Sequence, residues 1–216
     1  MVWRNLLWAE WRKLRRSKIV GIAVFAVCLT VGIVLAGGME VYRGPEVHYG
    51  VKAMRDGMRY IENAGWCMDE VQPWSMFFVL PGMVALFGSY LSSREREDDT
   101  MKSLLLIPVE ETDLMRAKMV LTLLFSIGLS MLLFGITFFT EAMLHAPDLS
   151  VPLVAALWKE YFLGGIGVFF AVFPIIAFAA RHRKSCWSVF LFTEIYSVFG
   201  LFAGMMNPVK DFYPIT

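Results

Sequence analysis

Five long apolar stretches constrain this chain more than any other feature. A helix that crosses a bilayer needs ~20 mostly apolar residues, and five ranges qualify: 19–39, 74–91, 119–140, 161–180 and 186–206. Of the 216 residues, 57% are hydrophobic and 18% are charged, a composition typical of membrane proteins rather than soluble ones. We therefore predict an all-α fold, a polytopic transmembrane helical bundle with five spans, which forms one transmembrane domain over residues 1–216.

The basic residues indicate how this bundle is oriented. If the N-terminus is cytoplasmic, fourteen of the 20 Lys and Arg residues lie inside, as the excess of cations in cytoplasmic loops requires. We expect a multi-pass protein of the plasma membrane with a cytoplasmic N-terminus. Five spans then place the C-terminus outside, residues 40–73 in an outer loop and residues 94–113 in a cytoplasmic segment.

The N-terminal 18 residues combine aromatic side chains with cations. Three tryptophans, Trp3, Trp8 and Trp11, are interspersed with a basic series that includes Arg12 and Arg15. A helix in the membrane surface has this composition, because indole rings lie at headgroup level and cations face anionic lipid. We predict an interfacial helix over residues 1–18. The alternative is an ordinary basic flank of the first span, which would not need three tryptophans.

The outer loop shows a helical periodicity of apolar residues. Val47, Val51, Met54, Met58 and Ile61 recur at intervals of three and four, which is one face of an amphipathic helix. We expect this helix to pack on the membrane surface or on the ends of the spans.

One carboxyl group lies deep inside a predicted span. Glu194 is in the last of the five ranges, where an ionisable side chain is costly and normally faces the bundle interior, a partner or a water-filled path. Glu194 is either a residue of a transport path or a protonated carboxyl that is hydrogen-bonded to Thr193 or Tyr196 of its own span.

The chain lacks the motifs of the common enzyme classes. No G-x-x-x-x-G-K-[ST] string for ATP phosphates occurs, and the three histidines are far apart. Glu110 and Glu111, followed by Arg116, superficially resemble a membrane-protease motif but have the wrong spacing and no intramembrane histidine. We therefore expect no catalytic, cofactor or metal site in this chain and no enzymatic activity.

The cytoplasmic segment contains a short apolar helix. Asp98 and Asp99 supply the acidic start of a helix from Thr100 to Leu106, and Pro108 ends it because a proline disfavours helical geometry in the residue before it. An isolated two-turn helix is marginal in water. Its apolar residues, Met101, Leu104 and Leu105, therefore need a surface, which is either lipid or a groove on a cytoplasmic partner.

This segment resembles the membrane subunits of ABC-2 type transporters. The resemblance lies in the sequence R-E-x-E-D-D-T-x-K-S-L-L-L-I-P-V, which begins at residue 94, and in the basic N-terminal helix that precedes the first span. It is most similar to the half-size permeases of lantibiotic self-protection and bacitracin resistance. The resemblance implies that the segment is the coupling helix that docks on a separate ATPase subunit. The residues that match the family motif are Glu95, Thr100, Leu104, Leu105 and Pro108, with Lys118 ten residues after the proline, and Asp98 and Met101 complete the predicted coupling set.

The resemblance also implies partners and an activity. The chain would pair with a second permease, identical or different, and with an ABC ATPase that binds ATP and Mg²⁺. This assembly would expel antimicrobial peptides or similar amphipathic compounds. Membrane lipid is the other expected partner, and nucleic acid is not expected. Members usually have six spans, so a sixth span is absent from the five predicted here.

Two other functions are compatible with the residues alone. The first is a non-transporting membrane protein that sequesters a peptide or anchors a cytoplasmic partner through the leucines at 104 and 105. The second is an intramembrane hydrolase that depends on Glu110 or Glu111.

Overall fold

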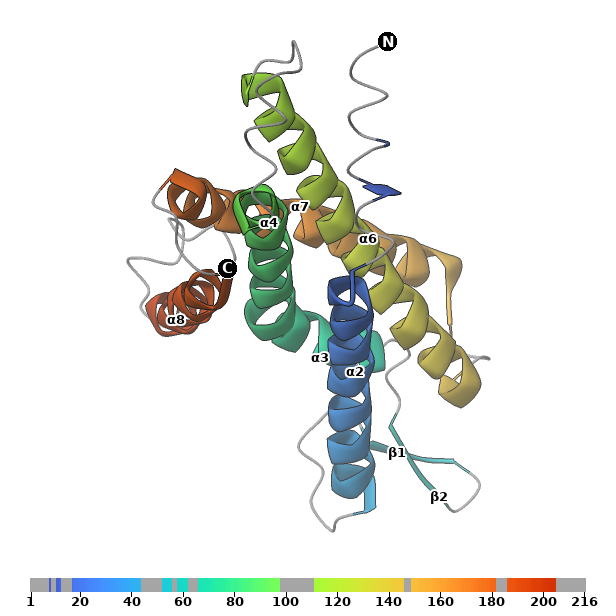
Figure 1. Cartoon of the computed structure of the whole chain (residues 1–216). Helices are drawn as coiled ribbons and strands as arrows, with labels where there is room; N and C mark the ends of the chain where they lie inside the picture. The colour runs from blue at the N-terminus through green and yellow to red at the C-terminus, as the bar shows by residue number, and fades with distance from the viewer. Residues whose placement is uncertain are drawn as a thin grey trace.

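The computed structural model describes residues 8, 11–12, 17–43, 52–55, 58–61, 66–97, 111–145, 149–181 and 186–204. Within these ranges the chain is a bundle of long helices with one small hairpin (Figure 1). The elements are α2 (Ile19–Arg43), β1 (Lys52–Arg55), β2 (Met58–Ile61), α3 (Trp66–Trp74), the π-helical turn η1 (Ser75–Val79), α4 (Leu80–Glu97), α6 (Glu111–His145), α7 (Val151–Arg181) and α8 (Cys186–Gly204).

The predicted all-α polytopic bundle is confirmed. Among the described residues, four helical segments are long and apolar enough to cross a membrane: Ile19–Gly37, Cys67–Ser93, Thr112–Met143 and Val151–Ala179. The apolar part of α8, Cys186–Gly200, is shorter. α6 has 35 residues, so it is about 52 Å long and exceeds the ~30 Å hydrocarbon layer.

The second predicted span is a composite helix that begins earlier than the sequence indicated. α3, η1 and α4 follow one another without a break from Trp66 to Glu97. The π turn lies between two prolines, Pro73 and Pro81, and Leu80 donates its N–H to the carbonyl of Ser75, five residues back. Prolines remove backbone donors, and single π turns of this kind occur frequently at functional sites.

The amphipathic helix predicted in the outer loop is wrong. Residues 52–55 and 58–61 form an antiparallel hairpin in which Lys52 pairs with Ile61 and Arg55 pairs with Met58. Between the strands the sequence is Asp56-Gly57, one of the dipeptides that two-residue hairpins prefer. This local turn preference outweighs the apolar periodicity, and Val47 and Val51 lie outside the described residues.

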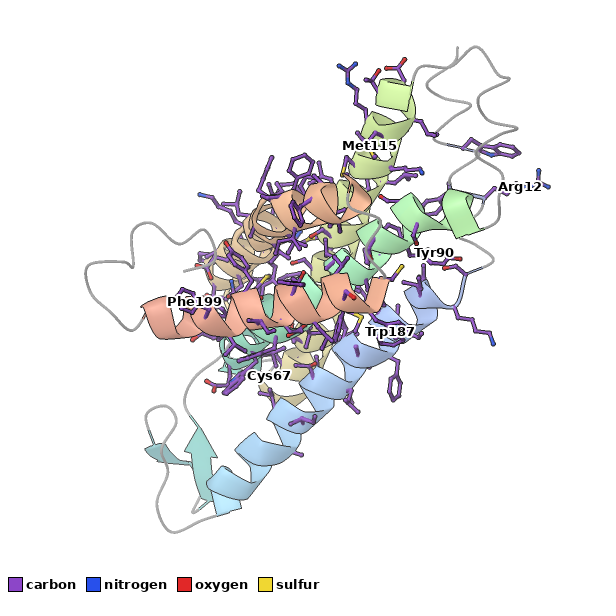
Figure 2. The ribbon with its side chains drawn as sticks, turned by 60° about the vertical axis from the view of Figure 1, so that its left-hand side comes forward. Arg12, Cys67, Tyr90, Met115, Trp187 and Phe199 are labelled. Atoms are coloured by element: carbon purple, nitrogen blue, oxygen red, sulfur yellow. The ribbon has the colours of Figure 1, made fainter. Side chains whose placement is uncertain are left out.

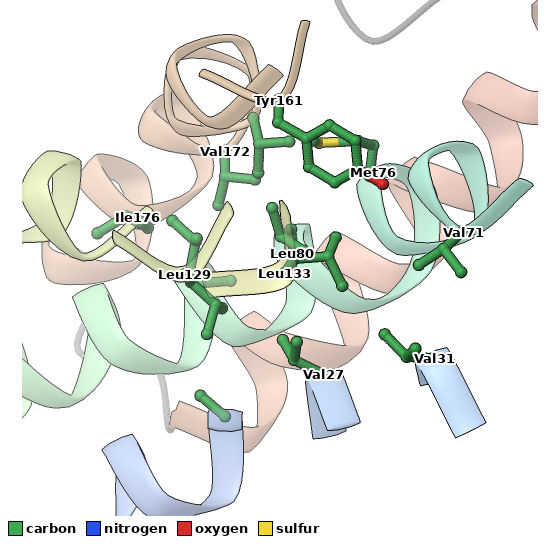
Figure 3. Packing of buried hydrophobic residues seen from close by; sticks show 14 of the residues in the cluster. Val27, Val31, Val71, Met76, Leu80, Leu129, Leu133, Tyr161, Val172 and Ile176 are labelled. Carbon is green, nitrogen blue, oxygen red and sulfur yellow. The ribbon is translucent and has the colours of Figure 1, made fainter. Parts of the chain in front are cut away.

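The core lies where α4 packs against its neighbours. α4 contacts α6, α7 and α8, while α2 packs against α6 and α3. Buried apolar side chains of α2, α3, α4, α6, α7 and α8 meet there (Figure 3), among them Val27, Leu80, Leu133 and Val172. Two serines of α6 bind the α7 backbone: Ser126 donates to the carbonyl of Gly165 and Ser130 to that of Tyr161, each at 2.6 Å.

The outward surfaces of the helices are strongly apolar. On α8 the exposed side chains include Trp187, Leu191, Ile195 and Phe199, and Figure 2 shows α8 crossing the front of the bundle with Trp187 and Phe199 near its two ends. Because large exposed apolar surfaces are rare on soluble monomers, this surface is suited to contact with lipid.

Candidate functional site

The predicted intramembrane carboxyl, Glu194, lies in the seam between α8 and α4. Its side chain is half-buried and stands directly against Gly82, where the ring of Phe190 also approaches. A β-carbon at residue 82 would lie 2.7 Å from Cε2 of Phe190 and would overlap the Glu194 carboxyl. The seam therefore depends on glycine at this position, one residue after Pro81.

Two buried serines lie on the segments that adjoin this contact. Ser197, one turn beyond Glu194, and Ser75 of η1 are fully buried, and their hydroxyl oxygens have no hydrogen-bond partner among the described residues. Thr193 donates its hydroxyl to the carbonyl of Val189 at 2.9 Å, so it has no hydrogen left to donate to the Glu194 carboxyl. Since α8 also packs against η1, a half-buried carboxyl, unpartnered hydroxyls and a π turn occur along one seam.

At its other end, α4 leads into the predicted coupling segment. Glu95 lies in the last turn of α4, with its side chain outside the described part. The other six predicted coupling residues lie outside the described residues altogether: Asp98, Thr100, Met101, Leu104, Leu105 and Pro108.

The two helices that flank this segment are firmly joined. The rings of Phe87 in α4 and Phe125 in α6 stack with centroids 3.8 Å apart, and the buried Leu91 and Leu121 extend this contact toward the segment. Ser93 forms a hydrogen bond of 3.1 Å with the thiol of Cys186, which ties α4 to the start of α8. α4 and α6 are therefore packed together on either side of residues 98–110.

The predicted interfacial helix is described at three positions. Trp8, Trp11 and Arg12 have helical backbone, and the Arg12 guanidinium lies 5.2 Å from the centre of the Trp8 ring. The two tryptophans are 61% and 62% exposed. Trp3 and Arg15 lie outside the described residues.

Sequence reasoning missed a second buried carboxyl, Glu141. It is fully buried near the end of α6, and its Oε2 accepts the backbone N–H of Cys67 at 3.0 Å. Nearby, the Tyr161 hydroxyl donates to the carbonyl of Met68. Glu141 thereby occupies the N-terminus of α3, where backbone donors and the helix dipole favour an anion. The one indication of Glu141 in the sequence is that it follows directly after the predicted third span, which ends at residue 140.

Comparison with known proteins identifies the kind of molecule. Residues 6–200 match the family described as ABC-2 family transporter protein. The bacitracin transport permease protein of Bacillus licheniformis is 32% identical over 127 residues, which are 57% of this chain and 61% of that relative. The chain thus spans about three-fifths of the length of the relative it matches. No solved structure is significantly similar to it.

Proposed function

The chain belongs to the ABC-2 family of transporter proteins, and from this premise we propose that it is the membrane-spanning subunit of an ATP-driven exporter of amphipathic antimicrobial compounds. ATP and Mg²⁺ bind to a separate ABC ATPase, and a second permease completes the assembly in the plasma membrane. The family match over nearly the whole bundle is the observation that carries this proposal. The bacitracin permease relative suggests a peptide antibiotic as the first substrate to test.

The arrangement around α4 supplies a physical route for the coupling. Residues 98–110 dock on the ATPase, and closure of the ATPase dimer displaces this segment. Because Phe87 and Phe125 stack closely, α4 and α6 respond together. α4 then shifts against α8 at the contact between Gly82 and Glu194, where a glycine permits sliding and the π turn permits a change of helix register.

Docking is tested by co-purification. The chain is co-expressed with a candidate partner ABC ATPase, and Leu104→Asp and Leu105→Asp are compared with Ser103→Asp. At about 100° per residue, Ser103 lies on the helix face opposite the apolar one, so this variant adds the same charge away from the leucines. We expect both leucine variants to lose the ATPase and the serine variant to keep it, because a carboxylate in an apolar groove is strongly disfavoured. Binding that survives in the leucine variants would refute the coupling role.

Export is tested by resistance. Cells that express the chain with its ATPase should tolerate a higher bacitracin concentration than cells that express either protein alone. An ATPase variant unable to hydrolyse ATP should abolish the gain. Resistance that persists with this inactive ATPase would indicate sequestration of the peptide in place of export.

A further inference from the structure

A cavity of about 560 Å³ lies between α7 and the segment formed by α3 and η1. This is the end of the bundle where α3 begins, on the side that the cation distribution assigns to the exterior. Polar side chains of α3, Asp69, Glu70 and Gln72, line one part of the cavity, and apolar side chains including Met76 and Phe77 line the rest. The cavity therefore has separate polar and apolar parts.

Two glycines of α7 produce the hollow. At Gly164 the side chain of Met76 occupies the space that a side chain would need, since Cε of Met76 would lie 2.6 Å from an added β-carbon. At Gly167 an added β-carbon would meet nothing within 4 Å. Met76 thus fills the space beside Gly164, whereas the space beside Gly167 remains open and forms part of the cavity.

The polar part is negatively charged. Asp69 is exposed and Glu70 is half-buried, and among the described residues that line the cavity none is a lysine or an arginine. Lys159 and Glu160 of α7 are both exposed, have opposite charges and do not line the cavity. The N–H of Cys67 at the start of α3 already binds Glu141, so neither cavity carboxylate is used for that contact.

We propose that this cavity binds amphipathic cations that enter from the outer membrane surface, with the cationic group at Asp69 and Glu70 and the apolar part against Met76 and Phe77. Its volume is in the range of drug-sized ligand pockets, roughly 300–1,000 Å³, so it accepts a small amphiphile or one amphipathic segment of a larger peptide. The inference rests on the proposed function, because it makes the cavity the site where exported compounds first bind.

Binding is measured on the purified full chain in nanodiscs of zwitterionic lipid, without ATPase. The probe is radiolabelled dodecyltrimethylammonium, and dodecyl sulfonate is its anionic counterpart; uptake by empty nanodiscs is subtracted. We expect saturable binding of the cation only. Asp69→Asn combined with Glu70→Gln should weaken this binding about tenfold, the effect of losing two partly exposed charge contacts.

A second variant fills the cavity without changing its charge. Gly167→Phe projects a ring into the open notch and should abolish saturable binding of the cation. Gly128→Phe is the matched control, because Gly128 of α6 is also open and does not line the cavity. Wild-type affinity in both the charge variant and Gly167→Phe would overturn the proposal. If Gly167→Phe does not fold, the affinity of the Asp69→Asn, Glu70→Gln variant for the cation tests the proposal by itself.

Two further outcomes separate cation binding in the cavity from export by the assembled transporter. Cation binding by the isolated chain, with no ATP-dependent transport after the ATPase is added, would retain the cavity and reject the exporter. ATP-dependent bacitracin resistance with unaltered strength in Gly167→Phe would retain the exporter and reject the cavity as its entry site.

Discussion

The Glu194 carboxyl in α8 occupies the space over Gly82 in α4 into which any side chain at residue 82 would project. Two helices far apart in the sequence thus meet through a carboxyl group and a residue that has no side chain. This contact lies one residue beyond Pro81 and close to the π turn that ends at Val79. α4 is also the helix that leads, at Glu97, toward the predicted coupling segment, so a shift of α4 against α8 would change this contact.

Gly82→Ala should therefore separate α4 from α8. The added methyl group overlaps Glu194 and crowds Phe190, and overpacking of this kind costs about 1–3 kcal/mol. We expect a lower thermal unfolding temperature in detergent. Combining Gly82→Ala with Glu194→Ala should restore much of the loss, whereas Gly128→Ala, at an open position of α6, should not destabilise. Equal unfolding temperatures for wild type and Gly82→Ala would contradict this account of the seam.

Glu194→Gln separates the charge of this side chain from its packing. Glutamine has the same shape and can rest on Gly82, but it cannot ionise or exchange a proton. We expect unchanged expression and unfolding temperature, together with several-fold weaker ATP-dependent bacitracin resistance, since intramembrane carboxyls are usually functional. Wild-type resistance in this variant would reduce Glu194 to a packing residue.

The helices could be predicted because each depends on a long local run of apolar residues. Their contacts could not, because the packing of Glu194 on Gly82 joins residues 112 positions apart (194 − 82), and nothing local to either residue identifies its partner. The sequence singled out Glu194 through its depth alone.

The missed features each have a physical reason. The predicted third span ended at residue 140, directly before an acidic residue, whereas α6 continues through Glu141 to His145. The Glu141 carboxylate is compatible with this buried position because it accepts the N–H of Cys67. The predicted second span began at residue 74, after a stretch that contains Asp69 and Glu70, whereas α3 begins at Trp66. In the outer loop, Asp56-Gly57 favours a hairpin over the helix that the apolar spacing indicated.

Glu141→Ala should loosen the start of α3. Without the carboxylate, the N–H of Cys67 is buried and unpaired, which costs about 1–3 kcal/mol. In a chain with Cys28→Ser and Cys186→Ser, the buried Cys67 thiol should then react with a membrane-permeant maleimide about tenfold faster, the factor that corresponds to ~1.4 kcal/mol.

The exposed Met143, two residues further along α6, supplies the control for this measurement. Met143→Ala should leave the labelling rate of Cys67 unchanged. Equal rates in Glu141→Ala and wild type would show that the hydrogen bond does not hold α3 in place.

Two serines of α6 hold this helix against α7. Ser126 and Ser130 each donate a 2.6 Å hydrogen bond to a backbone carbonyl of α7. Hydrogen bonds between helices in membranes contribute about 0.6 kcal/mol on average, up to about 1.7, so Ser130→Ala should lower the unfolding temperature slightly. Ser130→Leu should lower it far more, because Gly165 lies against Ser130 and leaves no space. Tolerance of leucine would contradict this close packing.

Orientation is tested with two cysteines introduced into a cysteine-free chain. Arg55→Cys lies in the hairpin, and Thr112→Cys lies at the exposed start of α6, at the opposite end of the bundle (Figure 1). Because cations favour the cytoplasmic side and fourteen of the 20 Lys and Arg residues fall on the side of the N-terminus, a membrane-impermeant maleimide should label Arg55→Cys in intact cells. It should label Thr112→Cys only after permeabilisation, and the reverse pattern would invert the orientation and place the Asp69 cavity on the cytoplasmic side.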